Sequence, residues 1–276
     1  MSANIPAKTP ASMELPTQVR VRPAASRAEL EEAFRLVYRS YLSRGYAAPD
    51  PTEIRLSVHN VLPETLTFVG ILRDDVIATV TLMPDSDLGL PMDGVYRKEL
   101  DALRREGRRL CEVSMLADRR MEIKRTLPML LSLMKLVFDY TTEVLHHTDL
   151  CITINPRHDA FYKRYLRFTD LAGERSYPNV QGHPALARRL DMLTARDLVK
   201  DIAFLRRAFF ENRTPRSLFD RRYIMSCDDV DYFFVKLTRT LEEASHSAIA
   251  FLKTRRPDCP WNRWPKGLLS SRDEPL

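Results

Sequence analysis

Glu112 stands in the middle of a segment, RLCEVSML at residues 109–116, that alternates in polarity as a β-strand does. A carboxylate is uncommon in such a strand and faces either solvent or a site. Partial burial there raises the pKa of the carboxyl group toward that of a general base. Ser114 lies on the same side of the strand, because side chains alternate with period two, and can relay a proton or bind a thioester. The alternative for Glu112 is an ion pair with Arg108 or Arg109.

A second group of polar residues follows the apolar segment LCITI at residues 150–154. Asn155 can hydrogen-bond the amide groups of a pantetheine arm. Tyr162, one helical turn beyond His158, can protonate a departing sulfur. Because FYKRYLRF is also an aromatic stripe at helical spacing, Tyr162 is equally explained as a core residue. His158 is equally explained as a helix N-terminal residue with no catalytic task.

No residue pattern indicates a covalent acyl-enzyme or a metal site. The sequence has no GxSxG and no local Cys–His signature, and Cys111 and Cys151 fall in apolar strands, where we expect core residues. The six histidines are spread out and the four cysteines show no CxxC, so we expect no metal and no cofactor. Isolated cysteines and the lack of a signal peptide predict a reduced, cytoplasmic protein. Direct transfer between two bound substrates needs positioning, a base and oxyanion donors.

The formal net charge is +6 over 276 residues. The basic residues come largely as doublets on mixed surfaces, which predicts attraction to an acidic protein, a nucleic acid or an anionic membrane face, or simple solvation of helix faces. No zinc finger, RNP box or basic-region heptad is present, so nucleic acid is the least favoured partner. The longest apolar stretch, residues 127–137, is interrupted by Ser132 and Lys135 and is too short to span a bilayer.

The hydrophobic pattern predicts a mixed α/β sheet followed by helices. Residues 1–17 carry three prolines among small polar residues and are expected to be a disordered leader. Ser26 and Glu29 form a capping box for the first helix. The expected strands are 18–23, 65–72, 76–83, 109–116, 150–154 and 186–192. The expected helices are 27–45, 98–106, 126–146 and 159–168, and the chain beyond residue 194 is helical in periodicity.

Four segments, in order along the chain, carry a resemblance to a known family. They are YRSYLSRGY, PDSDLGLPMD, RRLCEVSM and NPRHDAFYKRYLRF, at residues 38–46, 84–93, 108–115 and 155–168. Together they resemble the catalytic core of the N-acyl amino acid synthases, GNAT-fold enzymes related to the autoinducer synthases. The resemblance implies a GNAT-like domain over 18–192, whose mixed sheet is flanked by helices and splayed between its fourth and fifth strands. Residues 193–276 then form a helical C-terminal extension.

The resemblance also implies the substrates. In this family the donor is a long-chain fatty acyl thioester on acyl carrier protein, and the acceptor is the amine of a free amino acid. Coenzyme A enzymes of this fold bind the pyrophosphate in a glycine-rich loop after the fourth strand. The corresponding stretch here, ADRRMEIKRT at 117–126, has no glycine. Four basic residues there suit a phosphopantetheine phosphate and the acidic helix of a carrier protein, although a solvated turn is the alternative: Arg119, Arg120, Lys124 and Arg125.

An amino-acid acceptor needs a cation for its carboxylate, ideally an arginine that binds with both arms of its guanidinium. Arg39, Arg44 and Arg55 lie in the segment that covers the acceptor side in this kind of fold. The sequence does not choose among them.

Three further expectations concern the rest of the chain. Arg167 stands where the family often has glycine. Trp261 and Trp264 indicate that the extension packs on the core or on a membrane surface. Three apolar positions of the long helix, equally explained as ordinary core, are expected to line an acyl-chain tunnel: Leu130, Met134 and Phe138.

These observations predict an N-acyltransferase that moves a long-chain acyl group from acyl carrier protein to an amino acid, by direct attack in a ternary complex. Two alternatives stay open. One is an acetyl-CoA-dependent N-acetyltransferase, which the glycine-free loop disfavours, and the other is a non-catalytic module that binds an acyl group or a carrier protein. The expected partners are acyl carrier protein and the amino acid, with a membrane surface as a further contact.

Overall fold

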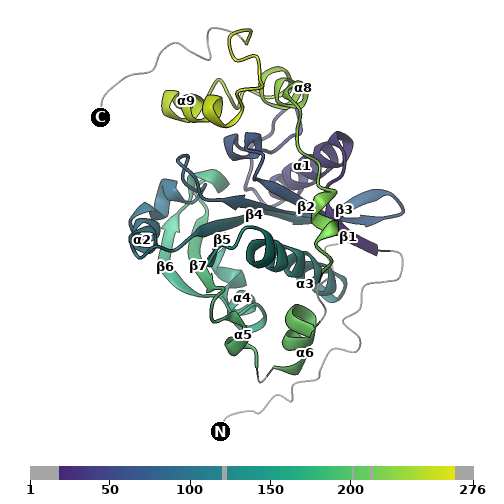
Figure 1. The fold of residues 1–276 in the computed structure, drawn as a ribbon, viewed down its shortest axis with the longest axis vertical. Coiled ribbons are helices and arrows are strands. Elements are labelled where there is room, and N and C mark those ends of the chain that lie inside the picture. Colours follow the sequence, from purple (N-terminus) through teal and green to yellow (C-terminus); the bar gives the residue numbers. More distant parts are fainter. Residues whose placement is uncertain (1–18, 120–122, 201, 212–213, 265–276) are drawn as a thin grey trace.

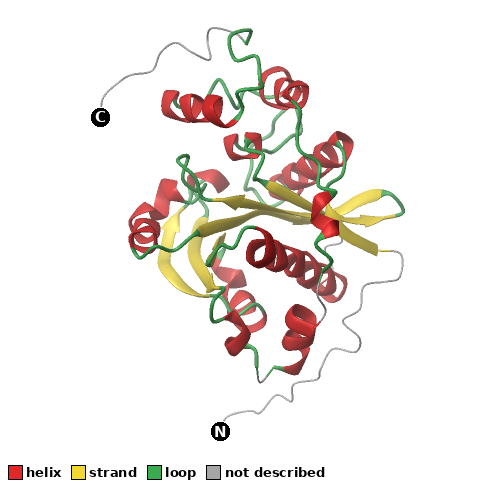
Figure 2. Cartoon of the chain, viewed as in Figure 1, coloured by secondary structure: helices red, strands yellow, loops and turns green. Residues whose placement is uncertain are grey.

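A seven-stranded mixed sheet forms the centre of the protein, with helices on both of its faces (Figure 1, Figure 2). The computed structural model describes residues 19–119, 123–200, 202–211 and 214–264, so the predicted leader lies outside the described residues. The strands are β1 (Val19–Pro23), β2 (Leu66–Leu72), β3 (Asp75–Pro84), β4 (Leu110–Asp118), β5 (Asp149–Ile154), β6 (Thr169–Ser176) and β7 (Pro184–Asp191).

The strand order in the sheet is β1-β2-β3-β4-β5-β7-β6. The pair β4–β5 is parallel, and the other neighbouring strands are antiparallel. The α-helices are α1 (Arg27–Leu42), α2 (Asp93–Arg105), α3 (Ile123–Asp139), α4 (Asp159–Tyr165), α5 (Ala195–Leu198), α6 (Ala203–Arg206), α7 (Ser217–Asp220), α8 (Cys227–Val230) and α9 (His246–Arg255). The predicted α/β class with a helical C-terminal extension is confirmed.

Three elements differ from the prediction. Helix α2 begins at Asp93, ahead of the predicted start at 98, because the Asp93 carboxylate accepts a hydrogen bond from the Leu90 amide at 2.6 Å and pairs with Arg104. Helix α3 begins at Ile123 and continues beyond Asp139 as the π-helical segment η2 (Tyr140–Val144). Strand β6 was not predicted, because its residues are mostly exposed and do not alternate; pairing with β7 makes it a strand.

Each face of the sheet carries its own hydrophobic cluster. Side chains of β4 and β5 such as Cys111 and Ile152 pack with Met129 and Val137 of α3 on one face. On the other face α1 covers β2 and β3, while α2 covers Leu110 and its neighbours. From Leu110 to Ser114, consecutive residues of β4 therefore point to opposite faces, as the period of a strand requires. Glu112 and Ser114 lie on the face covered by α1 and α2.

Strands β4 and β5 separate partway along their length. Their pairing runs from Leu110–Asp149 to Val113–Ile152, while β4 continues to Asp118 and β5 to Ile154. Beyond this point β4 carries a bulge, because two of its residues oppose Val80 of β3 and Met115 adopts a φ of 53°. A bulge bends its strand and leaves one residue outside the ladder. The predicted splay between the fourth and fifth strands is confirmed.

A buried carboxylate joins the strands at the closed end of this V. The Asp149 side chain has 0% exposure, and its Oδ2 accepts hydrogen bonds from Arg108 Nε and Thr148 Oγ1, both at 2.6 Å. Arg189 of β7 pairs with the same carboxylate, and Arg108 reaches Asp191 at 2.7 Å. Such a network is stable only when every member keeps its partners.

The C-terminal extension wraps around the β1 edge of the sheet (Figure 1). Its first part lies on the α3 face, and α7 then lies against β1, where Phe219 packs edge-to-face on Tyr140 at 5.2 Å. Helices α8 and α9 follow on the α1 face, where the segment η6 (Asp231–Leu237) places Phe233 5.6 Å from Phe34. Trp261 and Trp264 are 9% and 6% exposed. Of the two predicted alternatives, packing on the core is therefore the observed one.

Two features concern the predictions for the cysteines and for Arg167: a disulfide and a left-handed backbone conformation. Cys227 and Cys259 form a disulfide, with Cα atoms 5.1 Å apart, so the predictions that all four cysteines stand alone and that the protein is fully reduced were wrong. Their separation of 32 residues carries no local signal, and only the folding of the extension brings them together. Arg167, where the family often has glycine, has a φ of 60°, a left-handed conformation that favours glycine. None of the described helices has the length and apolarity needed to cross a bilayer.

Removing the Asp149 carboxylate should destabilise the fold strongly. Asp149→Asn leaves Arg108 and Arg189 without their buried counter-charge, and we expect the free energy of unfolding to fall by about 3 kcal/mol. Urea titration of the full chain measures this. The matched control is Asp74→Asn, whose pair with Arg20 is almost fully exposed (92% for Asp74), so its loss costs less than about 1 kcal/mol. Equal effects of the two substitutions would contradict the role given to Asp149.

Candidate active site

Glu112 is buried in β4, in the last part of the region where β4 and β5 are paired. Its side chain is 1% exposed, and Oε2 accepts a hydrogen bond from the Met92 amide at 2.8 Å. The pKa of this carboxyl group is raised to about 8, mainly by burial; the Met92 amide opposes this rise, and the nearby Asp93 carboxylate adds a smaller one. A carboxyl group with this pKa exchanges its proton close to neutral pH, which is the property of a general base.

The ion-pair alternative for Glu112 is wrong. Arg108 pairs with Asp149 and Asp191 instead, at the closed end of the V. Within the described parts of the chain, Glu112 has no ion pair at all, and its hydrogen bond is to a backbone amide. A buried carboxylate without a cation is costly to ionise, which is why its pKa moves upward rather than downward.

The loop between β3 and α2 positions the Met92 amide. Arg104 of α2 binds Asp85 at the start of this loop at 2.7 Å and Asp93 at its end at 2.6 Å. Burial raises the pKa of Asp93, but the hydrogen bonds from Arg104 and the Leu90 amide outweigh it and lower the pKa overall. Arg104 therefore holds both ends of the loop that supports Glu112.

Two tyrosines lie beside Glu112. Tyr41, near the end of α1, has its pKa raised by burial and by the Glu112 carboxylate, against a lowering by Arg55. Tyr177 is 7% exposed and follows β6, and its pKa is raised by burial and then by Glu112. Both phenols therefore lie within electrostatic reach of the Glu112 carboxylate. The nearby Thr153 side chain lowers the pKa of Tyr177. The buried Thr153 hydroxyl has no hydrogen-bond partner of good geometry among the described residues.

Arg55 brings a cation to the same place. Its guanidinium carbon lies 4.6 Å from the centroid of the Tyr41 ring, and it donates a hydrogen bond to the backbone oxygen of Asn179. Asn179 in turn donates to the Tyr177 hydroxyl at 3.0 Å. Burial lowers the pKa of Arg55, but an arginine stays charged at any working pH. The site therefore combines a neutralisable carboxyl group, a permanent cation and two phenols.

The structure separates the three arginines that the sequence left equivalent. Arg39 pairs with Glu53 at 3.3 Å on the surface. Arg44 is exposed and donates to the Ser40 backbone oxygen at 2.7 Å. Arg55 alone of the three stacks on Tyr41 and reaches the Tyr177 side of the site.

The residues after β5 occupy the rim of the site. Asn155 Oδ1 accepts from the Arg157 amide at 3.1 Å and so caps the short segment η3 (Pro156–His158). His158 is exposed, and its Nε2 accepts from Arg157 Nε at 3.0 Å. The pKa of His158 is lowered by partial burial of the ring and by Arg157 and Arg44. The Asn155 side chain therefore has a structural task as well as a free amide nitrogen.

Tyr162 lies between the site and the hydrophobic core. Its ring packs edge-to-face on Phe161 at 5.5 Å and on Phe168 at 6.0 Å, as the core alternative predicted. Burial raises its pKa, and Tyr41 raises it further, so the two phenols are close. The Tyr162 hydroxyl makes no hydrogen bond to the described residues and stays protonated. Both interpretations of Tyr162 are therefore compatible with its position.

The structure shows few contacts for Ser114 and for the basic loop at residues 117–126. Ser114 is half-buried, one step past the last β4–β5 pair, and its hydroxyl has no hydrogen-bond partner in the described chain. Arg119 is exposed, 3.4 Å from Glu32 and 3.8 Å from Asp75, so acidic neighbours already offset its charge. Arg120 and the side chains of Lys124 and Arg125 lie outside the described residues.

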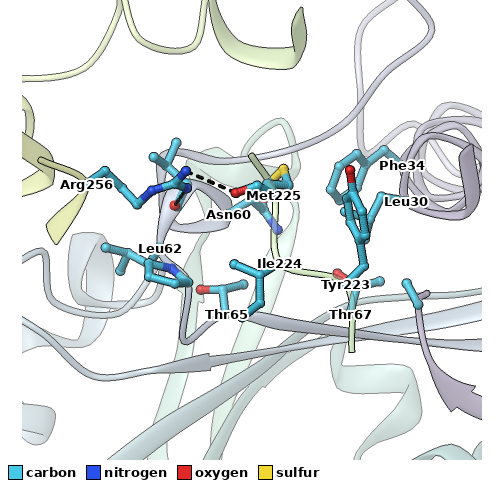
Figure 3. Close-up of a pocket in the computed structure, with 13 residues that line it drawn as sticks. Leu30, Phe34, Asn60, Leu62, Thr65, Thr67, Tyr223, Ile224, Met225 and Arg256 are labelled. Atoms are coloured by element: carbon cyan, nitrogen blue, oxygen red, sulfur yellow. Dashed lines mark hydrogen bonds between the residues drawn. The ribbon is translucent and has the colours of Figure 1, made fainter. Parts of the chain in front are cut away.

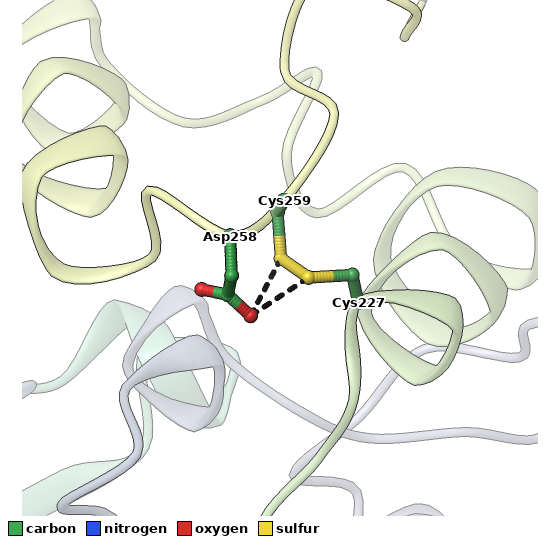
Figure 4. A group of neighbouring side chains, drawn as sticks. All are labelled: Cys227, Asp258 and Cys259. Atoms are coloured by element: carbon green, nitrogen blue, oxygen red, sulfur yellow. Dashed lines mark hydrogen bonds between the residues drawn. A yellow bond between two sulfur atoms is a disulfide. The ribbon is translucent and has the colours of Figure 1, made fainter.

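Cysteines provide neither a nucleophile nor a metal site here. Cys111 and Cys151 are fully buried, and burial raises the pKa of both thiols, so thiolates are disfavoured. Cys227, Asp258 and Cys259 gather their ligand atoms within 4.8 Å of one another (Figure 4). The two sulfurs are bonded to each other, and Arg256 already supplies a cation to Asp258 at 3.2 Å. This group therefore crosslinks two parts of the extension, and its sulfurs are not thiolates that could bind a metal.

A polar hollow between α1 and the extension is structural as well (Figure 3). Arg256, 4% exposed, donates to the backbone oxygens of Met225 at 3.0 Å and Val61 at 3.3 Å. Asn60 accepts from the Ser57 amide at 2.8 Å. Arg256 thus holds the extension against the core at this hollow, whereas the Asn60 bond lies within its own segment.

Sequence reasoning did not find Tyr41, Tyr177, Asn179 or Met92 as parts of the site. Tyr41 fits the apolar face of a helix, and nothing in its spacing shows that the ring also faces Glu112. Tyr177 and Asn179 lie in the connection after β6, a strand that was not predicted. Met92 acts through its backbone, which carries no sequence signal.

Replacing Glu112 by Gln should stabilise the protein at alkaline pH. The folded pKa of about 8 exceeds the ordinary value of 4.5, so the unfolded chain ionises first as the pH rises. Ionisation of Glu112 lowers the free energy of unfolding of the parent protein. This loss is absent at pH 4, grows between about pH 4.5 and 8, and is then constant, on the order of a few kcal/mol. Melting curves from pH 4 to 9 measure the difference. The control Glu29→Gln should have the opposite sign at pH 7, because Arg22 lowers the pKa of Glu29.

The same variant should lose turnover while it gains stability. If Glu112 is the base, activity rises with pH as this group loses its proton, and Glu112→Gln lowers kcat by roughly 10²–10⁴-fold and removes that rise. Rates and melting temperatures are measured on the same preparation. A fully active variant with an unchanged pH profile would move the base to another group, with His158 next.

Comparisons with known proteins agree with this geometry. The family model of the N-acyl amino acid synthase FeeM matches residues 32–191, whereas no curated protein sequence matches the chain. The structure of FeeM, an N-acyl amino acid synthase from uncultured soil microbes, has 31% sequence identity and a TM-score of 0.58, covering 67% of this chain and 97% of FeeM.

Two other solved structures show similarity at lower identity. The AHL synthase LasI has 12% identity and a TM-score of 0.49, covering 72% of this chain and 96% of LasI. The CoA-dependent acyl-homoserine lactone synthase BjaI has 16% identity and a TM-score of 0.48, covering 67% of this chain and 89% of BjaI. With a family match over more than half of its length, the chain belongs to the FeeM family of N-acyl amino acid synthases and is an acyltransferase.

Proposed function

We propose that the enzyme transfers a long-chain fatty acyl group from the phosphopantetheine thioester of an acyl carrier protein to the amine of an amino acid. The acyl carbon forms a bond to the amine nitrogen and loses its bond to sulfur, while both substrates are bound. The observation that carries the proposal is Glu112, a buried carboxyl group whose pKa is raised to about 8 at the point where β4 and β5 separate.

Glu112 acts as the base in this scheme. An amine attacks only when neutral, and it sheds a further proton as the amide forms. The Glu112 carboxylate takes a proton from the amine, and burial makes the resulting carboxylic acid the favoured form. Oxyanion stabilisation is assigned to backbone amides at the β4 bulge, around Met115, which lie outside the regular ladder.

The departing sulfur lies on the other side of the gap. Tyr162 is the group assigned to protonate it, since its hydroxyl keeps its proton and has no hydrogen-bond partner among the described residues. Asn155 is assigned to the amide groups of the pantetheine arm. The buried thiols of Cys111 and Cys151 support direct transfer, because neither favours the thiolate that an acyl-enzyme needs.

Arg55 and Tyr41 are assigned to the acceptor. A guanidinium can bind a carboxylate with two parallel hydrogen bonds, and its stacking on Tyr41 fixes the plane of that fork. The cation and Glu112 share two neighbours, Tyr41 and Tyr177, so an amino acid bound by its carboxylate presents its amine toward the base.

The glycine-free stretch 117–126 supports a carrier protein over coenzyme A as the donor. The test is a competition between lauroyl- or palmitoyl-loaded acyl carrier protein, palmitoyl-CoA and acetyl-CoA, with a mixture of the twenty amino acids and product detection by mass spectrometry. We expect long-chain N-acyl amino acids, with kcat/KM for the loaded carrier at least about 100-fold above that for acetyl-CoA. Equal use of acetyl-CoA would refute the long-chain donor, and equal use of palmitoyl-CoA would refute the carrier. The carrier as donor would also place the reaction in the cytoplasm, with the amphiphilic product passing to a membrane surface.

Arg55→Lys should raise the KM for the amino acid by about tenfold and leave the KM for the donor unchanged. Lysine keeps the charge but loses the planar, two-armed geometry. The control is Arg39→Ala, because Arg39 pairs with Glu53 on the surface and should leave both constants unchanged. A rise in the donor KM instead, or the larger acceptor effect in Arg39→Ala, would show that the acceptor carboxylate binds elsewhere.

A further inference from the structure

An apolar hollow lies on the α3 face of the sheet. About 400 Å³ of space lies between its walls, including space that is open to solvent. Three sides come from the family domain: α3, strands β5 and β7, and the corner between α4 and β6. Six apolar side chains represent these sides: Met134, Phe138, Leu150, Leu166, Phe168 and Leu190. Two of the three positions predicted to line an acyl tunnel, Met134 and Phe138, are among them.

The fourth side belongs to the C-terminal extension. Val199, Leu205, Phe209 and Phe210 line the hollow from the segment that runs from α5 to the π-helical turn η5 (Arg207–Glu211). Phe138 of α3 packs edge-to-face on Phe210 at 5.1 Å and on Phe209 at 5.9 Å. Figure 1 shows α5 and α6 beside α3 and α4. The family match ends at residue 191, so this wall is a feature of this chain beyond the family domain.

Two aromatic rings lie between the hollow and the active site. Phe168 lines the hollow and contacts Tyr162, with ring centroids 6.0 Å apart. Burial raises the pKa of Tyr162, and the Tyr41 phenol raises it further. Strand β5 has its Leu150 side chain in the hollow and Cys151, its next residue, facing Glu112 across the β4–β5 pair. The inference takes the acyl chain from the reacting carbonyl group past the Tyr162 and Phe168 rings into the hollow.

We propose that the C-terminal extension determines the length of acyl chain that the enzyme accepts, with Phe209 and Phe210 as the end wall of the acyl-chain site. The inference rests on the proposed function, in which the donor is a long-chain acyl thioester. Each methylene buried in an apolar site adds about fourfold to affinity. That gain continues until the chain end meets the two rings, and longer chains must displace them.

The test compares acyl-chain length profiles of the full-length protein and three variants. Phe210→Ala removes part of the wall, whereas Val199→Phe fills the hollow from the same side. Phe251→Ala is the matched control, because Phe251 lies in the same extension but packs on the α1-side cluster. Saturated fatty acids of 8 to 18 carbons are titrated against bound cis-parinaric acid, a fluorescent fatty acid, and melting curves confirm that each variant is folded.

We expect the longest well-bound chain to increase by about two carbons in Phe210→Ala, with roughly a tenfold gain for the first chain too long for the parent protein. Val199→Phe should shorten the profile by a similar step, and Phe251→Ala should leave it unchanged. If Phe210→Ala does not fold, the Val199→Phe profile decides the question. Identical profiles in all proteins, or no displacement by any fatty acid, would overturn the proposal.

The assay separates this inference from the proposed function. Displacement of a fatty acid involves neither a carrier protein nor an amino acid. Shifted profiles in an enzyme that makes no N-acyl amino acid would leave the end wall in place and refute the proposed reaction. The reverse result, N-acyl amino acids of unchanged chain length from Phe210→Ala and Val199→Phe, would refute the end wall alone.

Discussion

The early end of the pairing between β4 and β5 is the constraint on which the site depends. Parallel strands that stayed paired would fill the middle of the sheet with backbone hydrogen bonds and leave no passage through it. Here the ladder stops at Val113–Ile152, and the bulge at Met115 bends β4 away. The strands remain joined at the other end because Asp149 binds arginines from the start of β4 and from β7. The two strands are thus joined at the Asp149 end and separated beyond Val113–Ile152, which gives the V shape.

This geometry buries the Glu112 side chain and so raises its pKa. The residue lies at the last part of the paired region, where the sheet still excludes water, and its hydrogen bond comes from one backbone amide. Had Arg108 been its partner, the pKa would have been lowered and the carboxylate would have been a structural group. The fold sends Arg108 to Asp149 instead, and Arg104 to the loop that presents Met92. Two ion-pair networks therefore use the charges of Arg108 and Arg104, and burial is the largest cause of the raised pKa of Glu112.

The C-terminal extension completes both faces of the sheet. It contributes aromatic rings to the cluster around α3 and to the cluster around α1, and it crosses from one to the other at the β1 edge. An edge strand presents unpaired backbone groups, and a covering segment limits association through that edge. Cys227–Cys259 and the buried Arg256 then hold the end of the extension in place. The extension is thus integrated into the core and forms one wall of the hollow beside the active site.

The sequence by itself determined the order of strands and helices up to β5, the splay implied by four family segments, and Glu112 as an unusual carboxylate within a strand. These depend on local periodicity and on residue types that are unusual where they stand. Tertiary structure decided the rest. Only packing made the exposed segment Thr169–Ser176 a strand, separated Arg55 from Arg39 and Arg44 by stacking it on Tyr41, and brought Cys227 to Cys259. Each of these outcomes joins residues far apart in the chain, and no short-range pattern records such contacts.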